Sequence, residues 1–188
     1  MRKEVLLHTC CAPCSIYVGE FFEKKGFEVV HMFYNPNIHP FEEYRRRWEA
    51  LNDLVCKTGR KLIAPFPYNP LEYFSVIQEG EGRCPQCYRL RLTQVARWGK
   101  EHGFSFFSTT LTISPYQDVA CIQRIGGEVG SDFGITFLGV DFREGFAESM
   151  QRAKNLNLYR QKYCGCIFSR WEGVKRRIWK SLTGRSFS

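Results

Sequence analysis

Seven of the chain's nine cysteines fall in three short clusters. The clusters are Cys10, Cys11 and Cys14; Cys84 and Cys87; and Cys164 and Cys166. Thiolates that converge from separate segments in a reducing compartment usually hold metal. Seven sulfurs exceed the need of one four-coordinate ion or one cubane cluster. The count therefore predicts a four-iron cluster together with a second metal or a reactive thiol pair.

The spacing of Cys84 and Cys87, in a Cys-Pro-Gln-Cys sequence, lets two thiolates chelate one centre. A helix is predicted to follow this pair, and a helix N-terminus lowers the pKa of nearby thiols. Taken alone, the pair is typical of a thioredoxin-like redox site, a zinc half-site or a cluster half-site. Structural zinc sites use two closed cysteine pairs, commonly at the edge of a domain. Here the cysteines are expected to converge where a parallel sheet binds its ligands, which favours an iron–sulfur centre over zinc. A disulfide-relay enzyme is the third alternative.

The other two clusters have less common spacings. Cys10 and Cys11 are adjacent, and we expect their side chains to point in different directions and serve two neighbouring centres. Gly165, between Cys164 and Cys166, permits a tight turn that brings both sulfurs to one ion or one cluster.

Outside the clusters, Cys56 and Cys121 lie in helical patterns and are predicted to be buried small hydrophobic side chains. The four histidines show no ligand spacing. Asp141 follows a predicted strand, where its carboxylate is suited either to binding a metal or to capping a turn. Neither a Gly-x-Gly-x-x-Gly sequence nor a P-loop occurs, so a nucleotide cofactor has little support.

The elements that must position these residues alternate between strand and helix patterns. Strands are predicted over 4–8, 28–34, 61–65, 104–110 and 135–140. Helices are predicted over 15–25, 41–58, 71–78, 88–102 and 144–155. Another helix is predicted to start at Ser114-Pro115. It ends near residue 125, or it continues to 133 and is broken or loosened around Gly126-Gly127. This alternation predicts a single α/β domain with a Rossmann-like, nucleotide-hydrolase-like parallel sheet of about five strands flanked by helices.

In such sheets, ligands bind at the carboxyl ends of the strands. Cys10 and Cys11 end the first predicted strand, Thr109 and Thr110 the fourth, and Asp141 the fifth. The pattern therefore predicts a metal site at the C-terminal edge of the sheet.

A chain of 188 residues suits one domain, which we divide into a catalytic part, 1–169, and a basic C-terminal helix or tail, 170–188. The N-terminus lacks a signal-peptide pattern and no apolar run approaches a membrane span, so we expect a cytoplasmic protein with no membrane partner.

A net charge of +8 favours a polyanionic partner. The cations cluster at Arg45, Arg46 and Arg47; at Arg89, Arg91, Arg97 and Lys100; and in the tail at Arg170, Lys175, Arg176, Arg177, Lys180 and Arg185. Trp171 and Trp179 interleave with the tail cations, which suits RNA binding. The alternative is an amphipathic helix that packs Trp171, Val174 and Ile178 on the core.

Four motifs in order resemble the QueH family, the epoxyqueuosine reductases that do not use cobalamin. They are His-Thr-Cys-Cys-Ala-Pro-Cys-Ser at 8–15, Cys-Pro-Gln-Cys-Tyr-Arg-Leu-Arg-Leu at 84–92, Thr-Thr-Leu-Thr-Ile-Ser-Pro at 109–115, and Tyr-Arg-Gln-Lys-Tyr-Cys-Gly-Cys-Ile-Phe-Ser at 159–169. The resemblance implies two-electron reduction of epoxyqueuosine to queuosine at the wobble position of tRNA. It also implies a [4Fe–4S] cluster beside a single iron ion, an external electron donor, and contacts with the tRNA anticodon loop.

The same resemblance places the clustered cysteines and an aspartate around the metals. We assign the cluster to Cys11, Cys14, Cys84 and Cys87, and place Cys10, Cys164 or Cys166, and Asp141 near the single iron. Cys10, Asp141 and Tyr163 are the candidate catalytic residues, with Tyr88 or a metal-bound water as other possible proton donors. Two alternatives remain: a tRNA thiolation enzyme, which would need an ATP-binding loop after the first strand, and a zinc-bound RNA-binding module.

Overall fold

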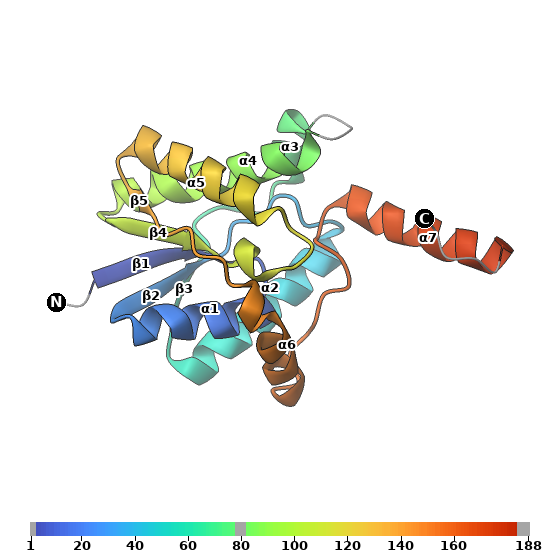
Figure 1. Ribbon diagram of the computed structural model, residues 1–188, viewed down its shortest axis with the longest axis horizontal. Coiled ribbons are helices and arrows are strands. Elements are labelled where there is room, and N and C mark those ends of the chain that lie inside the picture. The colour runs from blue at the N-terminus through green and yellow to red at the C-terminus, as the bar shows by residue number, and fades with distance from the viewer. Residues whose placement is uncertain (1–2, 78–81, 184–188) are drawn as a thin grey trace.

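A computed structural model describes residues 3–77 and 82–183, and its centre is a parallel sheet of five strands (Figure 1). The strands are β1 (Lys3–His8), β2 (Phe27–Met32), β3 (Lys61–Ile63), β4 (Phe106–Thr109) and β5 (Thr136–Phe137), in the order β3-β2-β1-β4-β5. Leu7 of β1 pairs with His31 of β2 and with Ser108 of β4. The predicted parallel α/β fold is confirmed.

Helices cover both faces of the sheet. They are α1 (Ala12–Lys24), α2 (Phe41–Thr58), α3 (Pro70–Val76), α4 (Arg83–Glu101), α5 (Val119–Phe133), α6 (Phe146–Asn155) and α7 (Ile167–Thr183), with short 3₁₀ turns at Thr110–Ile113 and Arg143–Gly145. In Figure 1, α4 and α5 pack together on one side of the sheet, and α1, α2 and α6 lie on the other.

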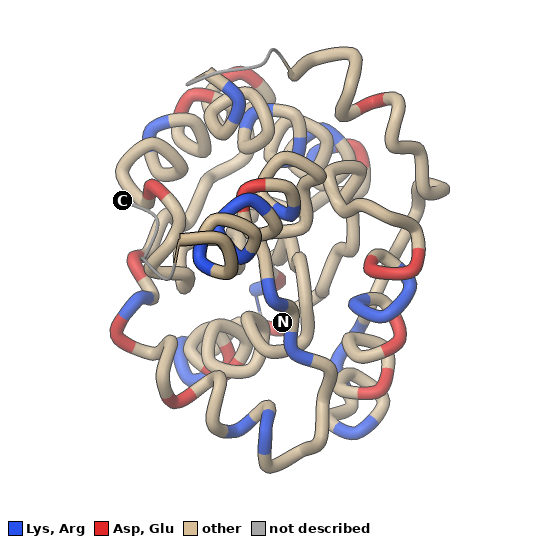
Figure 2. The backbone as a smooth tube through the Cα atoms, turned by 90° about the vertical axis from the view of Figure 1, so that its right-hand side faces the viewer, with Lys and Arg blue, Asp and Glu red and all other residues tan. Residues whose placement is uncertain are grey.

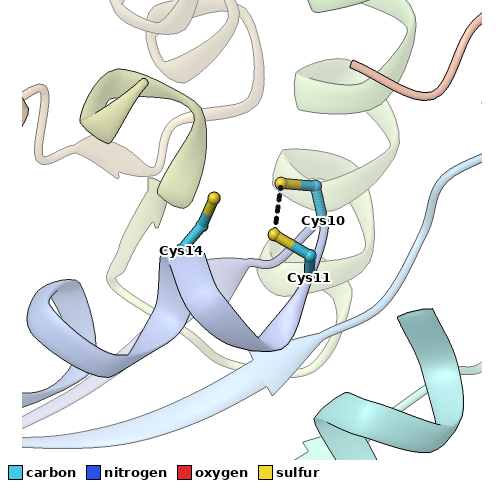
Figure 3. A group of neighbouring side chains, drawn as sticks. All are labelled: Cys10, Cys11 and Cys14. Atoms are coloured by element: carbon cyan, nitrogen blue, oxygen red, sulfur yellow. Dashed lines mark hydrogen bonds between the residues drawn. The ribbon is translucent and has the colours of Figure 1, made fainter. Parts of the chain in front are cut away.

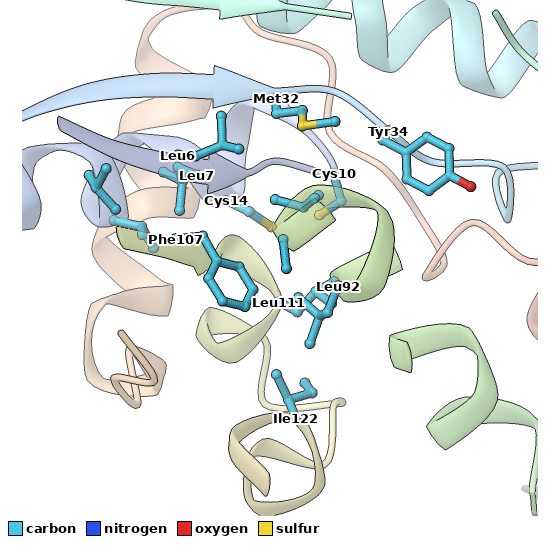
Figure 4. Packing of buried hydrophobic residues seen from close by; sticks show 14 of the residues in the cluster. Leu6, Leu7, Cys10, Cys14, Met32, Tyr34, Leu92, Phe107, Leu111 and Ile122 are labelled. Atoms are coloured by element: carbon cyan, nitrogen blue, oxygen red, sulfur yellow. The ribbon is translucent and has the colours of Figure 1, made fainter. Parts of the chain in front are cut away.

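The central strand explains why the predicted site is enclosed. Val5, Leu6 and Leu7 of β1 are all fully buried, because helices cover both faces of the strand. The chain leaves this strand inside the core, so Cys10 and Cys14 belong to the same apolar cluster as Leu92 and Leu111 (Figure 4). The first cysteine cluster, Cys10, Cys11 and Cys14, therefore lies at the carboxyl edge of the sheet but beneath the surface of the protein.

Local sequence signals placed some elements correctly and misplaced others. The helix predicted over 41–58 is α2, which ends at Gly59 in the left-handed conformation, with φ of 69°. The helix expected at Ser114-Pro115 starts later, after Asp118, whose side chain accepts a 2.9 Å hydrogen bond from the Cys121 N–H. It is unbroken at Gly126, where the missing side chain leaves room for the Phe137 ring.

Two further boundaries differ at the predicted site. α4 begins at Arg83, one turn earlier than expected, so Cys84 and Cys87 lie within the helix rather than before it. β5 has only two residues, Thr136–Phe137, so Asp141 follows the strand after a three-residue segment instead of ending it.

The basic C-terminal helix forms, but the alternative in which its apolar side chains pack on the core is wrong. No residue of α7 is buried, and Trp171 and Ile178 are each about half exposed. In Figure 1 this helix leaves the body of the molecule as a separate arm. The expectations for Gln78 and Arg185 fall outside the described residues. Within the described ranges, 3–77 and 82–183, no helix combines the length and hydrophobicity needed to span a bilayer.

Candidate metal centre

Cys10, Cys11 and Cys14 form one compact group of sulfur atoms, here called the triad. The three Sγ atoms all lie within 4.8 Å of one another, and Cys10 and Cys11 are 3.7 Å apart (Figure 3). Cys11 is the extended N-cap residue between β1 and α1, and Cys14 lies in the first turn of that helix. The expectation that the adjacent cysteines diverge is wrong, because the strand-to-helix turn gathers all three.

The protonation of the triad is uneven. Hydrogen bonds with the Cys11 and Cys14 thiols hold the pKa of Cys10 well below its usual range, and the positive charge of Arg47 acts in the same direction. Burial raises the pKa of Cys11, and hydrogen bonds to its neighbours raise that of Cys14. One thiolate beside two thiols is a site that releases protons when a metal cation binds.

Two polar side chains contact the triad. Thr110 accepts a hydrogen bond from the Cys10 N–H at 3.3 Å, and its Oγ1 lies 3.6 Å from the Cys10 sulfur. Gln161 donates from Nε2 to the Cys11 sulfur at 2.9 Å. Thr110 was expected at this edge of the sheet. Gln161 was missed, because a glutamine between two basic residues carries no ligand-spacing signal, although it lies inside the fourth motif.

Cys84, Cys87, Cys164 and Cys166 make up the second group, here called the tetrad. The Cys164 and Cys166 sulfurs are 3.5 Å apart, and Cys87 and Cys166 share a buried cluster with Tyr73. Cys84 and Cys164 are exposed, so the tetrad reaches the surface whereas the triad does not.

The turn between Cys164 and Cys166 requires glycine. Gly165 has φ of 122°, and a Cβ atom there would lie 2.9 Å from the Ile38 side chain. The hydrogen bond with Cys166 lowers the pKa of Cys164 to about 5. Burial raises the pKa of Cys87 to about 11, so the helix N-terminus does not depress it as expected.

Two buried arginines face the cysteines. Arg47 donates from Nη1 to the Cys164 carbonyl at 3.1 Å and from Nε to Glu43 at 2.8 Å. Arg91 donates to the Cys87 carbonyl at 3.2 Å; burial opposes its charge, but Cys87 and Cys10 raise its pKa above the ordinary value. Both arginines were expected to contact RNA, but they are buried, and the cysteine charges instead help to raise their pKa values.

The other predicted residues have hydrogen-bond partners that are not sulfur atoms. Asp141 is exposed, and its carboxylate accepts hydrogen bonds from the Arg143 guanidinium, which lowers the pKa of Asp141. Tyr163 donates to the His39 carbonyl, and burial raises the pKa of Tyr163 to about 12. Tyr88 donates to Gln117 at 2.7 Å. Among the described residues, only the triad brings three potential metal-ligand atoms within 4.8 Å of one another.

The two remaining cysteines are less buried than predicted. Cys56 is exposed and Cys121 is partly buried. Neither lies in the triad or the tetrad.

Comparison with known proteins places the chain in a family. A family model described as Epoxyqueuosine reductase QueH matches residues 5–172. The epoxyqueuosine reductase QueH of Dehalococcoides mccartyi is 39% identical over 176 residues, covering 92% of this chain and 95% of that protein. Its counterpart from Staphylococcus aureus is 34% identical, covering 90% of this chain and 76% of that protein.

Solved structures show the same fold at low sequence identity. A predicted subunit of tRNA methyltransferase from Methanocaldococcus jannaschii is 15% identical, with a TM-score of 0.53 over 98% of this chain and 90% of that one. The U34-tRNA thiolase NcsA from Methanococcus maripaludis, solved with its [4Fe-4S] cluster, is 11% identical, with a TM-score of 0.56 over 96% of this chain and 67% of that one. The fold is thus shared with tRNA-modifying proteins, and the sequence matches show that the chain belongs to the epoxyqueuosine reductase QueH family.

Proposed function

We propose that the chain reduces epoxyqueuosine to queuosine in tRNA. The observation that carries this function is the presence of two cysteine groups, the triad that follows β1 and the tetrad with its 3.5 Å Cys164–Cys166 pair, in a QueH-family fold. In the reaction, two electrons and two protons convert the epoxide into an alkene, and the epoxide oxygen leaves as water. The electrons come from an external donor.

The cysteines fit iron in two places. Buried, closely spaced thiolates are the ligands that iron–sulfur clusters use, and the structural neighbour NcsA carries such a cluster. Four sulfurs that surround one ion at 2.3 Å lie about 3.8 Å apart, so the triad spacing suits a single ion. The tetrad offers the four thiolates that a [4Fe–4S] cluster takes. This division moves Cys11 and Cys14, assigned from sequence to the cluster, to the single iron.

Each metal would supply one part of the chemistry: electrons from the cluster, and Lewis acidity at an open position of the single iron. The chain's own residues do the rest. Arg47 and Arg91 balance the thiolate charge, and Gln161 orients the Cys11 sulfur. The exposure of Cys84 and Cys164 suits electron entry from outside.

Cys10, Asp141 and Tyr163 remain the proposed reacting residues. Cys10 has the lowest thiol pKa of the triad, which suits a permanent metal ligand. Asp141 would have to exchange Arg143 for the metal, and Tyr163 would have to leave the His39 carbonyl to deliver a proton. Tyr88 is the alternative proton donor.

The tRNA would lie against α7 and the neighbouring cations. Figure 2 looks toward the face from which α7 projects and shows Lys and Arg along this helix. Its one acidic residue, Glu172, is paired with Arg83 at 2.8 Å, which leaves the helix positively charged. Arg45 and Arg46 of α2 are further exposed cations, and phosphate contacts of this kind give salt-dependent affinity.

The test is anaerobic reduction of epoxyqueuosine-containing tRNA by purified protein with a chemical reductant. We expect product nucleoside lighter by one oxygen, and about five irons and four sulfides per chain. Intact substrate with iron-loaded protein would refute the reductase. Zinc without sulfide would favour an RNA-binding zinc protein, and a requirement for ATP would favour a thiolation enzyme.

A further inference from the structure

A groove of about 380 Å³ lies between α3 and α4, outside the cysteine site. Its α4 wall begins at Gln86, between Cys84 and Cys87, and runs to Arg97. The eleven helical steps from Gln86 to Arg97 span about 16 Å. Leu90, which lines the groove, packs on its other side against the cluster that holds Cys87 and Cys166. The groove therefore shares a wall with the tetrad.

The groove offers polar groups along one side and apolar groups along the other. Thr93 and Gln94 line it with a hydroxyl and an amide on the outward face of α4, while the inward face carries buried Leu92 and Val95. Leu90 and Val76 supply its apolar surface. A planar group with hydrogen-bonding edges fits such a lining.

The charge at the groove is positive. Arg97 is exposed and forms no ion pair with a described residue, and its guanidinium lies 5.7 Å from the centre of the Phe133 ring. The one acidic side chain in the lining, Glu72, accepts a 2.5 Å hydrogen bond from Tyr34. Arg89, the second cation, is paired with Glu128 on α5. Arg97 is thus the cation available to an anionic ligand.

We propose that this groove binds a nucleotide next to the modified base in the single-stranded anticodon loop, an inference that rests on the proposed function. A nucleotide combines a flat base, hydrogen-bonding edges and a phosphate, which match Leu90, Gln94 and Arg97 respectively. The groove volume of about 380 Å³ is within the range of small-ligand sites. Because the groove adjoins the tetrad, a base held there fixes which neighbouring nucleotide reaches the metal centre.

The experiment measures the dissociation constant for an anticodon stem-loop and the KM for tRNA. Arg97→Gln is expected to raise both about tenfold, with kcat, iron and sulfide unchanged. Lys154→Gln removes one charge from α6, does not line the groove, and is expected to match the wild type. Unchanged binding by Arg97→Gln would overturn the proposal.

A second measurement pairs the protein with altered RNA. Thr93→Val/Gln94→Leu and an abasic site beside the modified base should each weaken binding, but together no more than either alone. Additive losses at both flanking positions would overturn the proposal. These binding measurements need no turnover, so a wild type that binds the stem-loop without reducing it would refute the reductase and still test the groove.

Discussion

Arg47 on α2 and Cys164 in the loop before α7 are joined by a hydrogen bond of 3.1 Å from the guanidinium to the carbonyl oxygen. The same side chain holds the Tyr163 carbonyl at 2.9 Å and is balanced by Glu43. One buried arginine therefore fixes the loop that brings the last cysteine pair to the other five.

Replacement of Arg47 by Met should destabilise the fold and empty the tetrad. The change leaves Glu43 buried without its partner, which costs about 3–5 kcal/mol of unfolding free energy. Denaturant unfolding and sulfide analysis check this. The double variant Arg47→Met/Glu43→Leu removes the stranded charge, so it should recover stability but not sulfide. Full sulfide in either variant would contradict the anchoring role.

Single cysteine replacements should separate the two metals. Cys14→Ser should lose about one iron and retain sulfide, because the triad spacing suits a single ion. Cys84→Ser should lose most sulfide and about four irons. Anaerobic iron and sulfide analysis with visible spectra measures both. Loss of sulfide from Cys14→Ser would instead support the sequence-based assignment of Cys14 to the cluster.

Asp141→Asn tests the carboxylate that follows β5 after a three-residue segment. If Asp141 binds the single iron, turnover should fall about tenfold while the sulfide content stays at the wild-type value. Arg143→Gln is the matched control, since it removes the guanidinium that now holds the carboxylate and should leave turnover intact. Equal turnover by Asp141→Asn and the wild type would remove this residue from the mechanism.

Salt dependence tests the arm formed by α7. Replacement of Arg176, Arg177 and Lys180 by Gln should weaken tRNA binding and lower the slope of log affinity against log salt concentration by about 2–3. The control changes three lysines outside this helix to Gln: Lys24, Lys25 and Lys154. This control variant has the same net charge as the α7 variant. If it lowers the slope by the same amount, the effect comes from overall charge rather than from contact between tRNA and α7.

The pH dependence of stability should include a contribution from His31. Burial lowers the pKa of His31 to about 3, against about 6.5 in the unfolded chain. A depressed folded-state pKa gives a contribution that is complete above pH 6.5 and is lost as the pH falls toward 3. At pH 5 the loss is about 2 kcal/mol. The advantage of the wild type over His31→Gln should shrink by that amount between pH 7.5 and 5, and a constant difference would contradict this.

Sequence predicts helix boundaries best where a local start or stop signal is not opposed by another nearby residue. The boundaries of α2 follow from Pro40 at one end and Gly59 at the other. The start of α5 does not, because the Asp118 side chain caps the helix and overrides the signal at Ser114-Pro115. Side-chain caps of this kind depend on the path of the chain into the helix.

The site shows the same limit. The clustered cysteines are visible in sequence, but their division into a buried triad and a partly exposed tetrad depends on how β1 and the Gly165 turn direct each side chain. Arg47 and Arg91 were assigned to RNA binding because sequence does not distinguish buried from exposed members of a basic cluster. Their burial in the structure makes that distinction. The exposed apolar side chains of α7 likewise follow from tertiary packing, not from its amphipathic pattern.

The distribution of the cysteines along the chain sets an order of events during biosynthesis. Cys10 and Cys166 are separated by 156 positions, so a ribosome that adds 5–20 residues per second makes the last thiol about 8–30 s after the first. During that interval the nascent chain carries the triad cysteines without the segment that supplies Gln161, Cys164 and Cys166. The triad cysteines are therefore all present early in synthesis, whereas the tetrad is complete only when translation reaches the start of α7.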